Sequence, residues 1–145
     1  RQKGKRIVLV GGCFDILHIG HVKFLEKARQ QANTLFVILE SDRSVQKLKG
    51  KNRPINTQKN RAIVLSSLTY VDYVVMLPNL NTNAQYDSIV SQIQPTIIAI
   101  TAKDPSIVHK IRQAKQINGK VVHVLQRISD QSTTRLARLI DQDLL

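Results

Sequence analysis

The segment GGCFDILHIGH, residues 11–21, holds two histidines, an aspartate and three glycines directly after an aliphatic run. His18 and His21 are three residues apart, so on a helix they would lie on one face, one turn apart. In a first helical turn they would lie beside unpaired backbone N–H groups and the positive end of the helix dipole. Gly20 would let a phosphate oxygen approach the backbone. The segment therefore predicts a phosphate-ester site with His18 and His21 as candidate catalytic residues.

The charge of the chain points to an anionic partner or substrate. Lys and Arg number 22 against 10 Asp and Glu, a formal net charge of +12, and such an excess favours binding of anions. A solvated surface that only aids solubility is the alternative for any single one of these cations. Many of them stand in one segment that holds no acidic residue: Arg43, Lys47, Lys49, Lys51, Arg53, Lys59 and Arg61.

Five short aliphatic segments predict the strands that must position these residues. They alternate with segments of helical periodicity, which is typical of an α/β domain with a Rossmann-like, doubly wound sheet of about five parallel strands. The basic segment after the second strand contains Gly50 and Pro54, so we expect a mobile loop with one or two helical turns near its start. The predicted strands are 7–10, 35–39, 73–77, 96–100 and 120–125, and the predicted helices are 18–31, 57–68, 84–93, 105–118 and one that opens with STTRLARLI.

Three polar clusters follow predicted strands, and we expect them at one edge of the sheet. Residues 11–21 follow the first strand, TAKD at 101–104 the fourth, and QRISDQSTT at 126–134 the fifth. Ligands of such sheets bind beyond the carboxyl ends of the strands, near the point where the strand order reverses. The clustering predicts that the site lies there.

Composition adds that one domain, residues 7–145, follows a basic lead-in over residues 1–6. The hydrophobic fraction of 42% is ordinary for a globular protein. No apolar run reaches the roughly 18 residues of a membrane span, and no secretory signal is visible. Cys13 is the one cysteine, so no intrachain disulfide can form, and a cytoplasmic location is expected.

The segment GGCFDILHIGH resembles the HxGH segment of the cytidylyltransferase-like nucleotidyltransferases. The further motifs SDRSVQKLKGKNRPIN, QKNR, VDYVV and STT follow in the order and rough spacing of the heptose-1-phosphate adenylyltransferase domain of lipopolysaccharide core biosynthesis. Glycerol-3-phosphate cytidylyltransferase is similar, somewhat less closely. The resemblance extends along nearly the whole chain.

The resemblance implies a reaction between a nucleoside triphosphate, ATP or CTP, and a small phosphorylated acceptor such as heptose 1-phosphate. The acceptor phosphate would attack the α-phosphorus in line and release pyrophosphate. Positioning and charge neutralisation would supply most of the catalysis. Mg²⁺ would be held mainly by phosphate oxygens, without metal ligands from the protein. Relatives are often dimers, so a homodimer is expected by analogy.

The resemblance also implies roles for individual residues. His18 and His21 would donate hydrogen bonds to the triphosphate, while Lys47 and Lys49 would contact the acceptor phosphate and the triphosphate. Cys13 would act through its backbone, with its thiol as a small core group. The residues implied to bind the nucleotide are Gly12, Cys13, Phe14, Gly20, Arg127, Ser132, Thr133 and Thr134.

Asp15, Lys47 and Arg61 are the residues implied to bind the acceptor substrate. Asp15 has alternatives, because it could hold Mg²⁺ through water or cap the following helix. Arg61 could equally form a structural salt bridge. Ser132 and Thr133 could cap the last helix, which is compatible with phosphate binding at the same helix end.

Two departures from the pattern leave the nucleobase open. After the fourth strand the resembling enzymes carry a glycine-rich, Asp-containing turn close to GGD, whereas this chain reads ITAKDP, with Lys103 and Asp104. Before STT, the letters SDQ stand in place of a TEG-like approach.

Other functions remain open on the sequence. An archaeal-type FAD synthetase shares the layout GxFDxLHxGH, and a nucleotide-binding protein without catalysis is a further alternative. A basic nucleic-acid-binding module would account for the charge of +12 but not for the histidine pair. Aromatic residues make up only 4%, and no helix-turn-helix, zinc-finger or RNA-recognition pattern is found.

Overall fold

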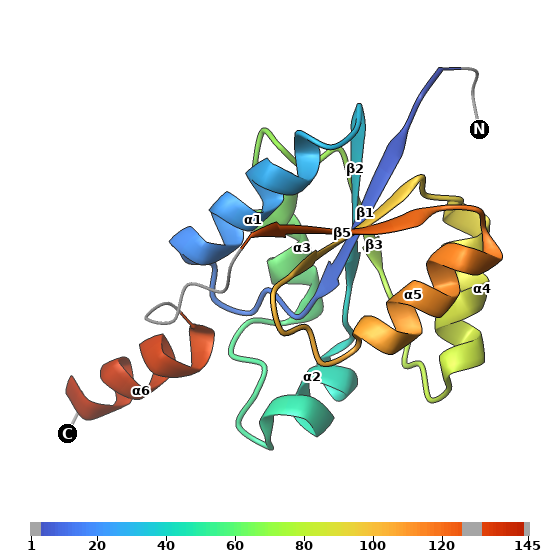
Figure 1. Ribbon diagram of the computed structural model, residues 1–145. Coiled ribbons are helices and arrows are strands. Elements are labelled where there is room, and N and C mark those ends of the chain that lie inside the picture. The colour runs from blue at the N-terminus through green and yellow to red at the C-terminus, as the bar shows by residue number, and fades with distance from the viewer. Residues whose placement is uncertain (1–3, 126–131, 144–145) are drawn as a thin grey trace.

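Five parallel strands form one sheet in the order β3-β2-β1-β4-β5. The computed structural model describes residues 4–125 and 132–143 (Figure 1). The strand order reverses at β1, so the crevice typical of doubly wound sheets lies beyond the carboxyl ends of β1 and β4. This confirms the predicted α/β fold, and the strands are β1 (Ile7–Gly12), β2 (Thr34–Leu39), β3 (Tyr73–Met76), β4 (Ile97–Thr101) and β5 (Lys120–Leu125).

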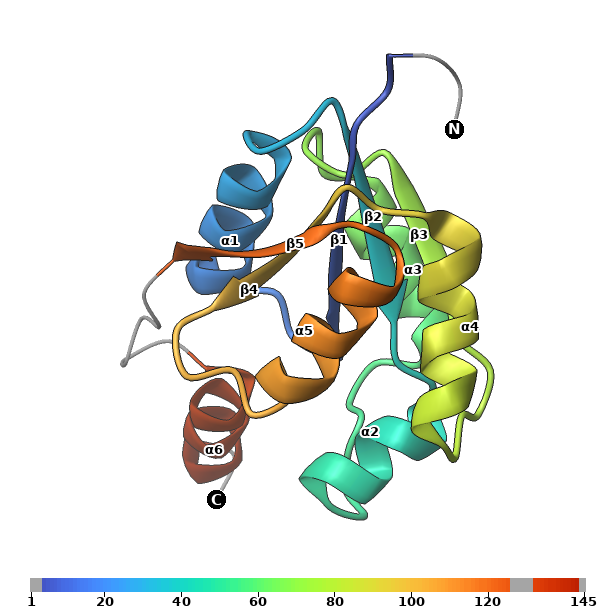
Figure 2. The same ribbon diagram turned by 45° about the vertical axis from the view of Figure 1, so that its right-hand side comes forward.

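Two helices cover each face of the sheet, as expected for a doubly wound fold. Figure 1 shows α1 and α3 on one side and α4 and α5 on the other, and Figure 2 shows α2 and α6 beyond the end of the sheet at which β1 ends. The predicted helices are confirmed within a few residues at each end. They are α1 (Ile19–Arg29), α2 (Asp42–Lys49), α3 (Gln58–Ser66), α4 (Asn83–Ile93), α5 (Ile107–Gln116) and α6 (Thr133–Asp143).

The basic segment begins with the eight-residue helix α2, about two turns, as expected for its start. Ser41 caps α2 by accepting a hydrogen bond from the backbone N–H of Ser44 at 3.1 Å. Ser44 and Val45 are buried, and the helix ends at Gly50, whose φ of 106° is readily adopted only by glycine. A cap and one buried face are sufficient to hold eight residues in a helix despite the many exposed cations.

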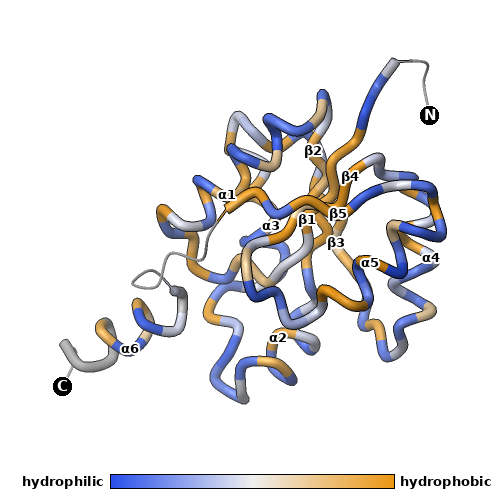
Figure 3. Tube along the Cα trace, in the orientation of Figure 1, coloured by the Kyte–Doolittle hydropathy of each residue, from blue (hydrophilic) through white to orange (hydrophobic). Residues whose placement is uncertain are grey.

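Alternate residues of β1 pack into two core clusters on the two faces of the sheet. Val8 and Val10 belong to the cluster beneath α1 and α3, and Leu9 belongs to the cluster beneath α4 and α5. Figure 3 shows the central strands as hydrophobic, whereas hydrophobic and hydrophilic residues alternate along the helices. In the described parts of the chain, no helix combines the length and apolarity needed to cross a membrane.

Truncation of Leu25 should reveal how much the α1 face contributes to stability. Leu25 lies on α1 with 0% of its surface exposed, so Leu25→Ala should lower the free energy of unfolding by about 2–5 kcal/mol. Leu48 on α2 is 67% exposed, and Leu48→Ala should change it by less than about 0.5 kcal/mol. Urea unfolding followed by circular dichroism measures both, and equal losses would contradict the described packing.

Candidate active site

A cavity of about 610 Å³ lies at the carboxyl end of β1, within the size range of small-molecule sites. Its lining comes from the β1–α1 connection, from the end of α2 with the loop that follows, and from the start of α6. The structure thus brings together segments that are more than a hundred residues apart in the sequence. The lining residues are Gly12, Cys13, Phe14, Asp15, His18, His21, Lys49, Arg53, Ser132 and Thr134.

The two predicted histidines lie side by side in the cavity wall. His18 is the N-cap of α1, and its Nδ1 accepts a hydrogen bond from the N–H of Gly20 at 3.1 Å. The proton of the neutral ring is therefore on Nε2, which can donate to a ligand. The rings of His18 and His21 have centroids 3.9 Å apart, and the Phe14 ring lies 5.2 Å from that of His21. The buried ring of Phe14 thus packs against His21.

Both imidazoles are neutral at pH 7. The pKa of His21 is lowered to about 4, chiefly by burial and also by the neighbouring His18, while a hydrogen bond to the backbone of Ile16 opposes this shift. Burial also lowers the pKa of His18. The pair can therefore donate hydrogen bonds to a polyanion but brings no positive charge to it.

Gly11 and Gly12 lie close to neighbouring side chains. A Cβ at position 12 would lie 2.9 Å from Cε2 of Phe14, and a Cβ at position 11 would lie 3.1 Å from Cγ1 of Ile38. Phe14 has a φ of 46° and is 5% exposed. Gly12 thus makes room for the ring that packs against His21.

Cys13 differs from the expectation for its thiol. The residue is only partly buried and lines the cavity, and it belongs to neither core cluster of the described residues. Burial raises the pKa of the thiol, so the sulfur is protonated at pH 7. Its carbonyl oxygen accepts a hydrogen bond from Arg61 Nη1 at 2.6 Å, so this part of the backbone is already engaged.

Only one of the two predicted lysines lines the cavity. Lys47 and Lys49 lie in the last turn of α2, where residues two apart point ~200° from each other around the helix axis. Lys49 is part of the cavity wall. Lys47 instead donates from Nζ to Oδ1 of Asn81 at 3.4 Å. The two lysines therefore differ in placement, and their contacts with the acceptor phosphate and the triphosphate stay a prediction.

Asp15 is a buried structural hub. Its side chain accepts hydrogen bonds from Arg53 Nε at 2.6 Å, from the Ile55 N–H at 2.8 Å and from the Asn56 N–H at 2.8 Å. Burial raises its pKa, but these hydrogen bonds outweigh burial and lower the pKa overall. The helix-cap alternative for Asp15 is wrong, because His18 caps α1. Arg53, a member of the basic segment for which the sequence predicted no role, lines the cavity with its Nε bound to this carboxylate.

Arg61 forms the structural salt bridge that the sequence offered as the alternative to substrate binding. The residue is 1% exposed and does not line the cavity. Its guanidinium donates to Cys13 O at 2.6 Å, Asn56 O at 3.0 Å and Glu40 O at 2.9 Å, and to Asp42 Oδ1 at 2.8 Å. It joins the ends of β1 and β2 to the loop before α3, and a substrate has no access to it in this arrangement.

The STT segment closes the cavity from the α6 side. Ser132 and Thr134 are lining residues, and Thr133 is the first residue of α6. Ser132 Oγ accepts a hydrogen bond from the Arg135 N–H at 3.1 Å, so Ser132 also serves as a helix cap. Arg127, predicted to bind the nucleotide, lies outside the described residues.

The cluster after β4 is not among the lining residues. Asp104 accepts hydrogen bonds from the Ser106 N–H at 2.8 Å and from Lys110 Nζ at 2.7 Å, which organises the start of α5. Lys103 has a φ of 60°, a conformation that glycine adopts more easily. Of the three polar clusters, the structure thus brings those after β1 and β5 to one cavity.

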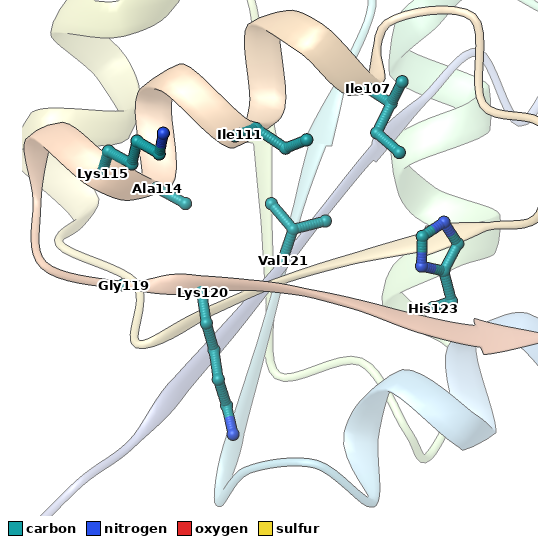
Figure 4. Close-up of a pocket in the computed structure, with 8 residues that line it drawn as sticks. All are labelled: Ile107, Ile111, Ala114, Lys115, Gly119, Lys120, Val121 and His123. Carbon is teal, nitrogen blue, oxygen red and sulfur yellow. The ribbon is translucent and has the colours of Figure 1, made fainter.

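A second cavity of about 320 Å³ lies between α5 and β5. Figure 4 shows Ile107 and Ile111 of α5 facing Val121 of β5, while Lys120 points away. The wall is largely apolar and contains none of the predicted site residues. This second cavity is therefore not a candidate for the predicted phosphate site. Over residues 4–125 and 132–143, no three His, Cys, Asp or Glu side chains are grouped to hold a metal ion.

Comparison with known proteins yields a match to the family model described as cytidylyltransferase-like, over residues 9–139. The bifunctional protein HldE of Campylobacter concisus is 43% identical over 136 residues, which cover 89% of this chain and 28% of that protein. HldE of Aliarcobacter butzleri is 40% identical over 135 residues, or 88% of this chain and 28% of that protein. The chain thus spans under a third of the length of these curated relatives.

Solved structures share the fold. The lipopolysaccharide core biosynthesis protein of Thermoplasma volcanium aligns with a TM-score of 0.68 at 21% identity, over 86% of this chain and 98% of that one. The pantoate-beta-alanine ligase of Francisella tularensis aligns with a TM-score of 0.61 at 16% identity, over 100% of this chain and 72% of that one. At such identities the likeness concerns the fold alone.

The buried state of His21 should make stability depend on acid. Its pKa falls from 6.5 in the unfolded chain to about 4 in the folded protein, so between these values the unfolded chain binds the proton first. The free energy of unfolding should therefore drop by about 3 kcal/mol as the pH falls from 6.5 to 4. His21→Asn lacks the titrating ring, so the same pH change should lower its free energy of unfolding by about 3 kcal/mol less than that of the wild type. Urea titrations across this pH range measure the free energy of unfolding of both proteins. The same pH dependence in the two proteins would contradict the lowered pKa of His21.

Arg61→Lys should destabilise the fold. A lysine keeps the charge but cannot serve four acceptors, so buried carbonyl groups lose their partners and we expect a loss of about 3–5 kcal/mol. Arg43→Lys, at an exposed position of the same basic segment, is the control and should be near neutral. Urea unfolding measures both. A stable Arg61→Lys variant would favour direct substrate contact instead.

Proposed function

The chain belongs to the cytidylyltransferase-like family of nucleotidyltransferases, and from this premise we propose its reaction. It transfers the nucleoside monophosphate of ATP to the phosphate of a sugar phosphate such as heptose 1-phosphate and releases pyrophosphate. The 40–43% identity to HldE proteins supports this choice of substrates. The proposed catalytic unit is residues 7–145, preceded by the lead-in 1–6.

One observation carries the proposal: a single cavity gathers the histidine pair, Lys49 and the start of α6. Neutral imidazole N–H groups, an ammonium group and a helix N-terminus are suited to bind phosphate oxygens. Among the described lining residues, Cys13 and Asp15 are not activated as nucleophiles, since the Cys13 thiol is protonated and the Asp15 carboxylate is bound to Arg53. A reaction whose nucleophile belongs to the substrate fits these groups.

In the proposed step an oxygen of the acceptor phosphate forms a bond to the α-phosphorus of ATP. The bond from that phosphorus to the oxygen bridging toward the β-phosphate breaks, and pyrophosphate leaves with the electron pair. No proton has to move, because the attacking phosphate is already ionised. His18 Nε2–H would donate to an oxygen of the α-phosphate, with its ring held by the Gly20 N–H, and would stabilise the charge that grows on the five-coordinate phosphorus.

Mg²⁺ is part of this proposal as a companion of the triphosphate. Among the described residues of the cavity wall, Asp15 is the only carboxylate, and it is bound to Arg53 and to the backbone of Ile55 and Asn56. The ion would therefore be held by phosphate oxygens, where it would neutralise charge. A cytoplasmic location and a homodimer also remain predictions, the second by analogy with related enzymes.

His18→Ala should reduce turnover by about 10²–10³-fold, the range for loss of one donor to a transition state. His109, exposed on α5, provides the control, and His109→Ala should retain full turnover. Pyrophosphate release with ATP, heptose 1-phosphate and magnesium measures both, alongside urea unfolding to exclude a loss of structure.

The same assay should be run with ATP and CTP crossed against heptose 1-phosphate, glycerol 3-phosphate and FMN. We expect the largest kcat/KM for ATP with heptose 1-phosphate. A preference for CTP with glycerol 3-phosphate, or for FMN, would replace the proposed substrates while keeping the reaction. An unchanged rate in His18→Ala would remove the imidazole from the mechanism.

A further inference from the structure

Arg53 presents unused hydrogen-bond donors to the active-site cavity. It lines the cavity, and its Nε donates to Asp15 Oδ2 at 2.6 Å. A guanidinium has five N–H donors, four of them on its two Nη groups. With the rest of the described chain, these four form no hydrogen bond. A planar donor group is thus held at the cavity with most of its capacity free.

The carboxylate of Asp15 fixes the position of this group. The side chains of Arg53 and Asp15 are 10% and 0% exposed. The same carboxylate accepts backbone hydrogen bonds from Ile55 and Asn56, so it immobilises the loop on both sides of Pro54. Asp15 is also three residues before His18. The β1–α1 connection therefore positions both the guanidinium and the imidazoles. These side chains are already ordered, so ligand binding costs little conformational entropy.

Positive charge in the described wall of the cavity comes from two side chains. Lys49 and Arg53 are its only cationic members. The other titratable groups in that wall are the neutral imidazoles of His18 and His21, the protonated thiol of Cys13 and the carboxylate of Asp15. A substrate with several negative charges must be neutralised here chiefly by the lysine and the arginine.

We propose that Arg53 binds a phosphate group of the substrates through its two Nη groups, and that Asp15 is the positioning residue that orients it. A planar guanidinium can bind two phosphate oxygens at once, which an ammonium group cannot do in a fixed geometry. This inference rests on the proposed function, because it assigns Arg53 to the same cavity. The phosphate can belong to the triphosphate or to the acceptor.

The test compares Arg53→Gln with Arg43→Gln, which removes the same charge from an exposed position of α2 outside the cavity wall. Isothermal titration with inorganic tripolyphosphate and with a non-hydrolysable ATP analogue measures binding without turnover. Loss of a charged hydrogen-bond pair should raise Kd about 10- to 100-fold in Arg53→Gln. Arg43→Gln should stay within about twofold. Arg53→Lys should recover only part of the loss.

Asp15→Asn separates positioning from charge. This change makes the cavity more positive by one unit, so charge alone would tighten binding of tripolyphosphate. If Asp15 orients Arg53, binding should weaken instead. Circular dichroism and urea unfolding establish that the variant is folded. Should it fail to fold, Arg53→Gln and Arg53→Lys test the phosphate contact independently.

Steady-state kinetics then identify the phosphate that is bound. A rise in KM confined to the nucleotide assigns Arg53 to the triphosphate, and a rise confined to the sugar phosphate assigns it to the acceptor. If Arg53→Gln binds tripolyphosphate and both substrates as Arg43→Gln does, the inference is overturned while the proposed reaction stands. If tripolyphosphate binding is lost in Arg53→Gln but wild type turns over no tested pair, the reaction is overturned and the role of Arg53 stands.

Discussion

The site depends on two buried charged side chains, Asp15 and Arg61, each of which is matched by its own partners within the protein. A charge removed from water must be matched by partners of good geometry. Asp15 is matched by Arg53 and two backbone N–H groups, and Arg61 by three carbonyl groups and Asp42. Asn56 serves both, because its N–H binds Asp15 and its carbonyl binds Arg61. The two networks therefore fix the β1–α1 connection against the loop before α3.

This constraint separates two kinds of polar residue in the motifs. Asp15 and Arg61 have chemically versatile side chains, yet their hydrogen-bonding capacity is used within the protein. Within the described part of the chain, His18, Lys49 and Arg53 keep donors without a protein partner at the cavity, and Asp15 and Arg61 hold the segments that carry them. The imidazoles contribute N–H donors without charge, because burial lowers the pKa of both rings. The described wall of the cavity thus combines neutral donors with two cationic side chains.

The fold was largely predictable because its signals are local. Continuous aliphatic runs identified all five strands, and helical periodicity identified the long helices. Helix α2 was predicted only as one or two turns at the start of the basic segment, and its eight residues form about two turns, with Ser44 and Val45 buried. The strand order was implied only by the fold class, since pairing joins residues distant in the sequence.

The sequence by itself determined the chemistry of the site: a histidine pair spaced for one helix end, a basic segment, and hydroxyl residues before the last helix. These features depend on residue type and short spacing, which the chain carries directly. Only the tertiary structure decided which cations face the cavity. Lys49 and Arg53 do, whereas Lys47 lies on the opposite side of its helix and Arg61 is enclosed by carbonyl groups. Helix phase and burial set these directions, and both arise from packing between segments that the sequence keeps apart.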